Sequence, residues 1–227
     1  MTTVYDERYA QRYREHDDEL DGVDAYNSLV EWLQQISRQL PAGFRALDLG
    51  CGTGRYFWAI ERAGEIVGVD ASAAMLSRAA HPVHADRIRG TSITLLHGDL
   101  AALDFEPGSF DLVYAVGVLA EHAPLDAAIV SRVRAWLRAG GRFAFTTVDP
   151  DSPSVPRTLL RRLARRAAGL APRAAAGVLH DRLLSGGLYA DERRIRELLT
   201  NGFAVESIEQ FESEAHLHCR VIAQKVS

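Results

Sequence analysis

Apolar residues follow a helical period over residues 24–39, near the start of the chain. The apolar positions, three or four residues apart, are Leu29, Trp32, Leu33, Ile36 and Leu40. Pro41 ends this pattern because proline cannot continue a helix. The spacing therefore predicts one amphipathic helix ahead of the first strand.

Short apolar runs then alternate with helical patterns through the middle of the chain. The runs that predict strands are 45–50, which reads as a buried one, 65–70, 92–97, 110–116 and 142–148. Helices are expected near 54–63, after the N-cap residue Ser72, and near 125–138, with Gly140 and Gly141 ending the last of them. Strands that alternate with helices indicate a parallel sheet covered on both faces.

The last forty residues break this alternation. A helical pattern near 191–200 precedes two strand patterns at 203–211 and 217–224, and no helix separates the two strands. Neighbouring strands joined this way must run antiparallel, because a parallel pair needs a crossover connection. We therefore expect a mostly parallel α/β sheet with one antiparallel strand near its edge.

Composition limits the chain to a few classes of protein. Its 227 residues, 47% hydrophobic and 25% charged, fit one folded domain of ordinary composition. No apolar run is long enough for a membrane helix, the N-terminus lacks a secretory signal, and Cys51 and Cys219 have no metal-ligand spacing. We expect a cytoplasmic protein that does not associate stably with membranes. A net charge of −4 also argues against binding to nucleic acid.

The charges are unevenly distributed. Residues 1–31 contain nine acidic residues and three arginines, whereas residues 155–180 contain six arginines and no acidic residue. Within the second block, residues 157–170 predict a helix with leucine and alanine on one side and arginine on the other. Three interpretations remain open for its arginines: a solvated face, an acidic partner such as an anionic substrate or the N-terminal segment, and a membrane surface.

The most informative segment is LDLGCGTG at 47–54, where the first strand turns into the next element. Gly50, Gly52 and Gly54 allow a tight turn and a close approach of a ligand to the backbone. Asp70 ends the second strand, where a carboxylate can accept both hydroxyl groups of a ribose. Asp48 adds an acid that a pyrophosphate would not favour, so the pattern indicates a positively charged nucleoside.

At this point the chain resembles the class I S-adenosylmethionine-dependent methyltransferases of the small-molecule type. The resemblance rests on LDLGCGTG, VGVDASAAML at 67–76, HGDL at 97–100, FDLVYAVGVLAEH at 110–122 and LRAGGRF at 137–143. It implies a Rossmann-like seven-stranded, mostly parallel sheet with an antiparallel last strand and helices on both faces. It also implies S-adenosylmethionine as cofactor and S-adenosylhomocysteine as product.

The resemblance assigns expected cofactor contacts by position. The glycine loop would pass under the methionine part, with Asp48 supporting it, and Asp70 with the adjacent Ala71 would bind the ribose. The remaining expected contacts are Asp99 for the adenine amino group, Leu100 and Met75 for the ring faces, and the carbonyl of Ala115 for the methionine ammonium.

His122 is the expected general base, because it follows the fourth strand on the loop that faces the ligand-binding end of the sheet. Its neighbour Glu121 is a weaker candidate, and the structural alternative is that this loop only caps a helix. Tyr5, Tyr9 and Tyr13 would line one face of an N-terminal helix, against either the cofactor or the sheet rim. His216 and His218 share a strand face but lack a third ligand, so no metal site is expected.

The predicted function is transfer of a methyl group to oxygen or nitrogen of a small-molecule acceptor, which includes anionic ones. The chain is expected to form a single domain, 1–227, and to act as a monomer or homodimer. A cap segment, 1–44, and a lid insertion, 149–187, would hold the acceptor. The alternatives are an NAD-dependent oxidoreductase and a non-catalytic sensor of S-adenosylmethionine.

Overall fold

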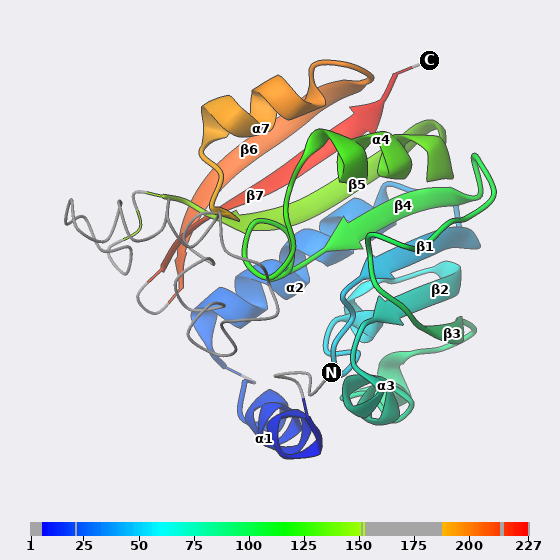
Figure 1. Cartoon of the computed structure of the whole chain (residues 1–227). Helices are drawn as coiled ribbons and strands as arrows, with labels where there is room; N and C mark the ends of the chain where they lie inside the picture. The colour runs from blue at the N-terminus through cyan, green and yellow to red at the C-terminus, as the bar shows by residue number, and fades with distance from the viewer. Residues whose placement is uncertain (1–5, 21, 151, 153–187, 214–215, 227) are drawn as a thin grey trace.

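A computed structural model describes residues 6–20, 22–150, 152, 188–213 and 216–226 of the chain. Within these residues the backbone forms one seven-stranded sheet in the order β3-β2-β1-β4-β5-β7-β6 (Figure 1). The strands are β1 Phe44–Leu49, β2 Ala63–Asp70, β3 Ser92–His97, β4 Phe110–Ala115, β5 Leu137–Val148, β6 Phe203–Ser213 and β7 His216–Lys225. The helices are α1 Glu7–Asp18, α2 Asp24–Arg38, α3 Ala73–Ala79, α4 Ala127–Trp136 and α7 Glu192–Leu199.

The strand directions confirm the predicted fold class. Strands β3, β2, β1, β4 and β5 pair in parallel, and β7 pairs antiparallel with both β5 and β6. The chain reverses its direction of progress between β1 and β4, which are adjacent in the sheet. Crevices at such a switch point, beyond the carboxyl ends of the strands, are where open α/β sheets bind ligands.

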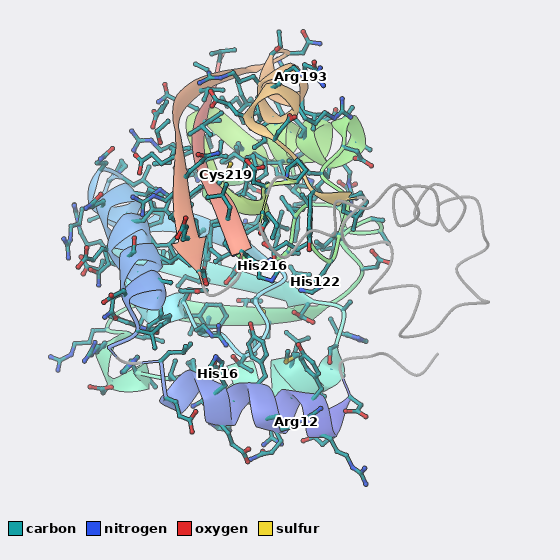
Figure 2. All side chains as sticks on the ribbon, turned by 90° about the vertical axis from the view of Figure 1, so that its left-hand side faces the viewer. Arg12, His16, His122, Arg193, His216 and Cys219 are labelled. Carbon is teal, nitrogen blue, oxygen red and sulfur yellow. The ribbon has the colours of Figure 1, made fainter. Side chains whose placement is uncertain are left out.

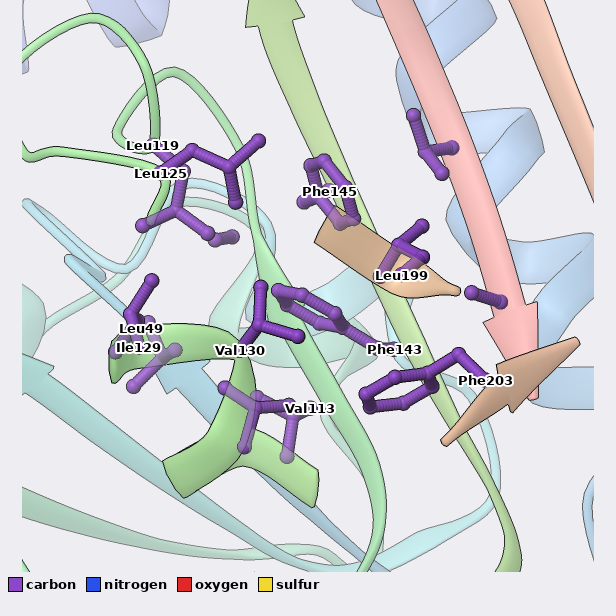
Figure 3. Packing of buried hydrophobic residues seen from close by; sticks show 14 of the residues in the cluster. Leu49, Val113, Leu119, Leu125, Ile129, Val130, Phe143, Phe145, Leu199 and Phe203 are labelled. Atoms are coloured by element: carbon purple, nitrogen blue, oxygen red, sulfur yellow. The ribbon is translucent and has the colours of Figure 1, made fainter. Parts of the chain in front are cut away.

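Two apolar layers, one on each face, hold the sheet between the helices. On one face α4 and α7 pack against β4, β5 and β7, where Phe143, Phe145, Val130 and Leu199 are buried (Figure 3). On the other face α2 buries its apolar stripe, including Trp32, against β1 and the segment that follows it. Burial of each large apolar side chain contributes roughly 1.5–3 kcal/mol, so both layers fix the strand ends that form the site.

The helix predicted near 54–63 is wrong. The described structure has only a single 3₁₀ turn, Phe57–Ala59, before β2 begins at Ala63. The buried ring of Phe57 lies where a Cβ at Gly54 or Gly68 would come within 2.8 Å of it, so the aromatic side chain fills the space beneath the glycine loop. The last residue of the predicted helix, Ala63, instead begins β2 and pairs with Phe44.

The predicted cap at Gly140 and Gly141 is also wrong, because α4 ends at Trp136. Leu137 is fully buried in an extended conformation and pairs with Phe110, so strand pairing replaces the last helical turn. Gly140, at φ +75°, instead lies within β5, in a segment where the register against β4 shifts. None of the helices in the described part of the chain is both long and apolar enough to span a bilayer.

Candidate functional site

The glycine loop closes the carboxyl end of β1. The backbone N–H groups of Gly50 and Cys51 both donate to the carbonyl of Val69, at 2.8 and 2.9 Å, which ties the loop to β2. Gly50 has φ +75°, and a Cβ there would lie 2.5 Å from the side chain of Val118. Gly52 has φ +54° and no atom within 4 Å of an added Cβ, so one side of the loop is open to a ligand.

Asp70 is held next to this open side by two backbone amides. Its Oδ2 accepts a hydrogen bond from the N–H of Gly52 at 2.9 Å, and its Oδ1 accepts one from Ser72 at 2.8 Å. Burial raises the pKa of Asp70, and the two amides oppose the increase. The amides thus orient the carboxylate, and the charge of His97 also opposes the rise in its pKa.

Asp48 lies one strand away and is only 4% exposed. Burial raises the pKa of Asp48 to about 8, the neighbouring Tyr114 hydroxyl opposes this, and the charge of Asp70 adds to the increase. No ion pair within the described residues involves Asp48. Burial disfavours the ionised form of both acids, and a positively charged ligand such as a sulfonium nucleoside would stabilise that ionised form, so such a ligand fits this place.

The other expected contacts lie at the same end of the sheet. Asp99 is exposed, and its Oδ1 accepts from the N–H of Ala101 at 2.8 Å, so the loop after β3 fixes its direction. Leu100 is partly buried against the core, and its carbonyl accepts from Arg132 at 2.6 Å. An adenine contact at Asp99 is therefore sterically accessible and stays a prediction.

Three further expected residues differ in their exposure. Met75 is 4% exposed and belongs to the buried face of α3. Ala71 is exposed, and its carbonyl lies 3.0 Å from Nε2 of His97. Ala115 is fully buried at the end of β4. Contacts of these residues with a cofactor stay predictions.

Helix α1 lies against the glycine loop through a buried ion pair. Asp17 accepts hydrogen bonds from the hydroxyl of Thr53 and from the guanidinium of Arg55. The same guanidinium lies 4.3 Å from the centre of the Tyr13 ring, which itself stacks on Tyr9 at 5.9 Å. The spacing of the tyrosines predicts the face that Tyr9 and Tyr13 share, but it does not predict the pair of Asp17 and Arg55, because residues 38 apart along the chain give no local signal of contact.

A cavity of about 100 Å³ lies beside this ion pair, beyond the ends of β4 and β5. Its lining consists of Tyr13, Leu29, Arg55, Tyr56, Val116, Gly117, Glu121, Thr146, Phe211, Ser213 and His218. Figure 2 views the molecule from this end of the sheet, with α1 passing below His122 and His216. The cavity is thus lined by residues from the N-terminal helix, from the switch point and from the last two strands.

Glu121 and His218 contribute the titratable groups of the cavity besides Tyr13, Arg55 and Tyr56. Glu121 Oε1 lies 3.8 Å from His218 Nδ1, and the two side chains are 17% and 14% exposed. Burial raises the pKa of Glu121 to about 7 and lowers the pKa of His218 to about 4, the latter with a contribution from His216. His122 is exposed and does not line the cavity, so its role as a base stays a prediction.

The arginine-rich helix predicted at 157–170 lies outside the described residues, as does most of the insertion at 149–187. Tyr5 of the tyrosine face lies outside them as well. In the described part of the chain, no group of three or more His, Cys, Asp or Glu side chains has the arrangement of a metal site.

Comparison with known proteins shows which family model and which relatives this chain is similar to. Residues 46–141 match the family model described as a methyltransferase domain. Over 145 residues the chain is 31% identical to the ubiquinone biosynthesis O-methyltransferase of Methylococcus capsulatus, a match covering 62% of this chain and 58% of that protein. It is 27% identical over 165 residues to the demethylmenaquinone methyltransferase of Lactococcus lactis, covering 69% and 64%. The chain therefore spans less than two thirds of the length of these curated relatives.

Solved structures extend the likeness to nearly the whole chain. An S-adenosylmethionine-dependent methyltransferase from Mesorhizobium loti has 28% identity and a TM-score of 0.61, and the match covers 91% of this chain and 100% of that one. The N-methyltransferase NodS from Bradyrhizobium japonicum, crystallised with S-adenosylhomocysteine, has a TM-score of 0.64 and a match covering 92% and 91%. At 14% identity, that second likeness concerns the fold alone.

Proposed function

We propose, from its membership of the class I S-adenosylmethionine-dependent methyltransferases, that this chain transfers a methyl group to oxygen or nitrogen of a small-molecule acceptor. The two curated relatives described above are named for quinone biosynthesis, which supports a small-molecule acceptor. The whole chain would act as one domain, 1–227, with residues 1–44 and 149–187 as segments that cover the acceptor.

The roles proposed for the cofactor follow the geometry of the loop and the strand ends. Asp70, oriented by the amides of Gly52 and Ser72, would accept the ribose hydroxyls. The open side of Gly52 would lie under the methionine part, and Asp48 would support the positive end of the ligand. Charged hydrogen bonds of this kind contribute roughly 1.5–3 kcal/mol each.

Further contacts are proposed for the residues beyond these. Asp99 would accept from the adenine amino group, and the ring would lie between Leu100 and Met75, next to Ala71. The carbonyl of Ala115 would accept from the methionine ammonium. All of these residues lie at or near the carboxyl ends of β2, β3 and β4, where ligands of such sheets bind.

When bound, S-adenosylmethionine supplies a methyl group that is already activated by its positively charged sulfur. The work left to the protein is to place the acceptor in line and to exclude water, which is worth several kcal/mol of the barrier. The α1 helix and the buried Asp17–Arg55 pair support that role, because they close one side of the cavity next to the glycine loop.

The observation that carries the proposal is Asp70, oriented by two backbone amides, next to the buried Asp48 and beside an open glycine loop. Titration calorimetry with S-adenosylhomocysteine and with NADH tests it directly. We expect S-adenosylhomocysteine to bind and NADH to produce no heat. Binding of NADH alone would instead support an oxidoreductase.

A second measurement separates an enzyme from a sensor. The full chain is incubated with methyl-labelled S-adenosylmethionine and a small-molecule extract of bacterial cells. We expect label in the small-molecule fraction only when the protein is present. Tight cofactor binding without any transfer would identify a sensor and contradict the proposed function.

A further inference from the structure

We propose that Glu121 takes the proton from the O–H or N–H group of the methyl acceptor, and that His218 on β7 positions its carboxylate. This inference rests on the proposed function and assigns the base within it. It replaces the exposed His122 with its neighbour along the chain. Three features lead to it: the turn that aims Glu121, the surroundings of its carboxylate, and the strand that brings His218 to it.

The turn after β4 is tightly bonded and directs two adjacent side chains differently. The carbonyl of Val118 accepts from the backbone N–H groups of Glu121, His122 and Ala123, at 3.3, 2.9 and 3.0 Å. Ala120 adopts a left-handed conformation with φ +62° and donates to the carbonyl of Ala123 at 2.8 Å. As a result, Glu121 lines the cavity, whereas His122 is exposed.

The surroundings of Glu121 leave one oxygen available. Oε1 is buried and has no hydrogen-bond partner within the described residues, and His218 Nδ1 at 3.8 Å is too far for a hydrogen bond. The nearby cation, Arg55, is already paired with Asp17. A buried carboxylate oxygen that faces a cavity without a partner is suited to receive a proton from a bound ligand.

His218 reaches this place because β7 is inserted between β5 and β6. Its Cα pairs with Val148 at the end of β5 and with Phe211 on β6. The ring stacks on Phe211 with centroids 5.1 Å apart and an interplanar angle of 18°, and it meets His216 at 5.7 Å. Aromatic contacts on both sides thus fix the imidazole beside Glu121.

The pKa values of Glu121 and His218 suit the two groups to different roles. The other titratable groups that line the cavity with Glu121 are Tyr13 from α1, Arg55 and Tyr56 after the glycine loop, and His218 from β7, whose ring contacts His216. Burial brings the pKa of Glu121 to about 7, which suits a base at neutral pH. Because burial lowers the pKa of His218 to about 4, its imidazole stays neutral and a weak base.

The proton balance of this step is simple. The O–H or N–H bond of the acceptor breaks, its proton goes to Glu121, and the electron pair stays on oxygen or nitrogen. That atom forms the new bond to the methyl carbon, while the electron pair of the broken carbon–sulfur bond stays on sulfur. The carboxylate becomes neutral, as does the sulfur, so no other reactant is needed. A carbon acceptor would not require this arrangement.

The first test measures the titration of Glu121 without any turnover. The full chain, labelled with ¹³C at glutamate carboxyl groups and saturated with S-adenosylhomocysteine, is titrated by NMR. We expect one carboxyl signal with a midpoint near pH 7, absent in Glu121→Gln and present in Glu106→Gln, a matched change at an exposed loop position. If no signal depends on Glu121, or if that signal titrates near pH 4.5, the inference is overturned.

The second test follows transfer of labelled methyl groups to the bacterial small-molecule extract between pH 6 and 9. We expect Glu121→Gln to reduce the rate at least 100-fold and to remove the rise near pH 7, while affinity for S-adenosylhomocysteine stays unchanged. Glu121→Asp should recover part of the rate. Wild-type rates in Glu121→Gln, loss of the pH dependence in His122→Asn instead, or a methyl group found on carbon would each overturn the inference.

The same assay tests the positioning role of His218. Replacement by alanine admits water beside the carboxylate, so we expect the rise in rate to move to lower pH and the rate to fall several-fold, with His218→Gln closer to wild type. An unchanged pH profile in His218→Ala would remove His218 from the assignment. Failure of the wild-type protein to bind S-adenosylhomocysteine would contradict the proposed function itself, which keeps the two outcomes distinct.

Discussion

At the scale of single residues, Asp70 is the group on which cofactor affinity should depend most. Its two oxygens are held by the amides of Gly52 and Ser72, so the side chain also fixes the glycine loop. We expect Asp70→Ala to weaken S-adenosylhomocysteine binding roughly 10- to 100-fold, because it removes at least one charged hydrogen bond. Calorimetry provides the measurement, with the exposed Asp86→Asn as control. Equal affinities for the two variants would refute the ribose assignment.

A substitution at Gly50 tests how tightly the glycine loop packs against Val118. An added Cβ would meet Val118 at 2.5 Å and would also strain a backbone at φ +75°. Gly90 has nearly the same φ, +72°, but nothing within 4 Å, so Gly90→Ala carries only the backbone cost, about 1 kcal/mol. We expect Gly50→Ala to lower the free energy of unfolding by about 1–3 kcal/mol more, measured by urea denaturation. An equal loss of unfolding free energy in the two variants would show that the side chain of Val118 moves aside without cost.

At the scale of secondary-structure elements, α1 depends on one buried ion pair. Asp17 is fully buried, and Arg55 is 14% exposed. Asp17→Asn leaves a buried cation unpaired, and we expect about 2–4 kcal/mol less protection of α1 amides in hydrogen exchange, with little change in the sheet. The same variant should bind S-adenosylhomocysteine more weakly. Glu15→Gln, an exposed change on the same helix, is the control, and equal exchange in both variants would show that α1 is held elsewhere.

The secondary-structure elements also show which features a local sequence pattern predicts and which depend on contacts between distant residues. The run 92–97 is a strand, as its apolar residues predict, and its ladder with β2 confirms it, although this edge strand is only partly buried. The helix expected at 54–63 does not form, because the ring of Phe57 packs under Gly54 and Gly68. No local sequence pattern shows this contact. The choice of His122 rested on its place in the chain, whereas the direction of each side chain depends on the bonded turn at Val118.

At the scale of the whole molecule, the sheet order assembles the candidate site from distant parts of the chain. Glu121 follows β4 and His218 lies on β7, and only the antiparallel insertion of β7 beside β5 brings them within 3.8 Å. Arg55, which also lines this cavity, donates a hydrogen bond to Asp17 on α1. The sequence therefore predicts the motifs at the ends of β1, β2 and β3, but it does not predict the contact between Glu121 and His218, which depends on the order of the strands.

The burial of Asp48 and Glu121 also predicts how the stability of the whole fold depends on pH. The pKa of Asp48 is about 8 and that of Glu121 about 7 in the folded protein, both above their unfolded values. A raised carboxyl pKa contributes stability that is complete below the unfolded pKa and is lost as pH rises through the folded value. His218, with its pKa lowered to about 4, works in the other direction and costs stability only below about pH 6.5.

We therefore expect the free energy of unfolding to fall by a few kcal/mol between pH 6.5 and 8.5, since each pH unit is worth about 1.4 kcal/mol per differing proton. Urea denaturation at several pH values measures this. The double variant Asp48→Asn with Glu121→Gln should flatten the curve and be more stable than wild type at pH 8.5, whereas Asp86→Asn should keep the wild-type slope. A wild-type curve that is flat over this range would mean that both carboxyl groups titrate normally, and the electrostatic basis of the candidate site would then be lost.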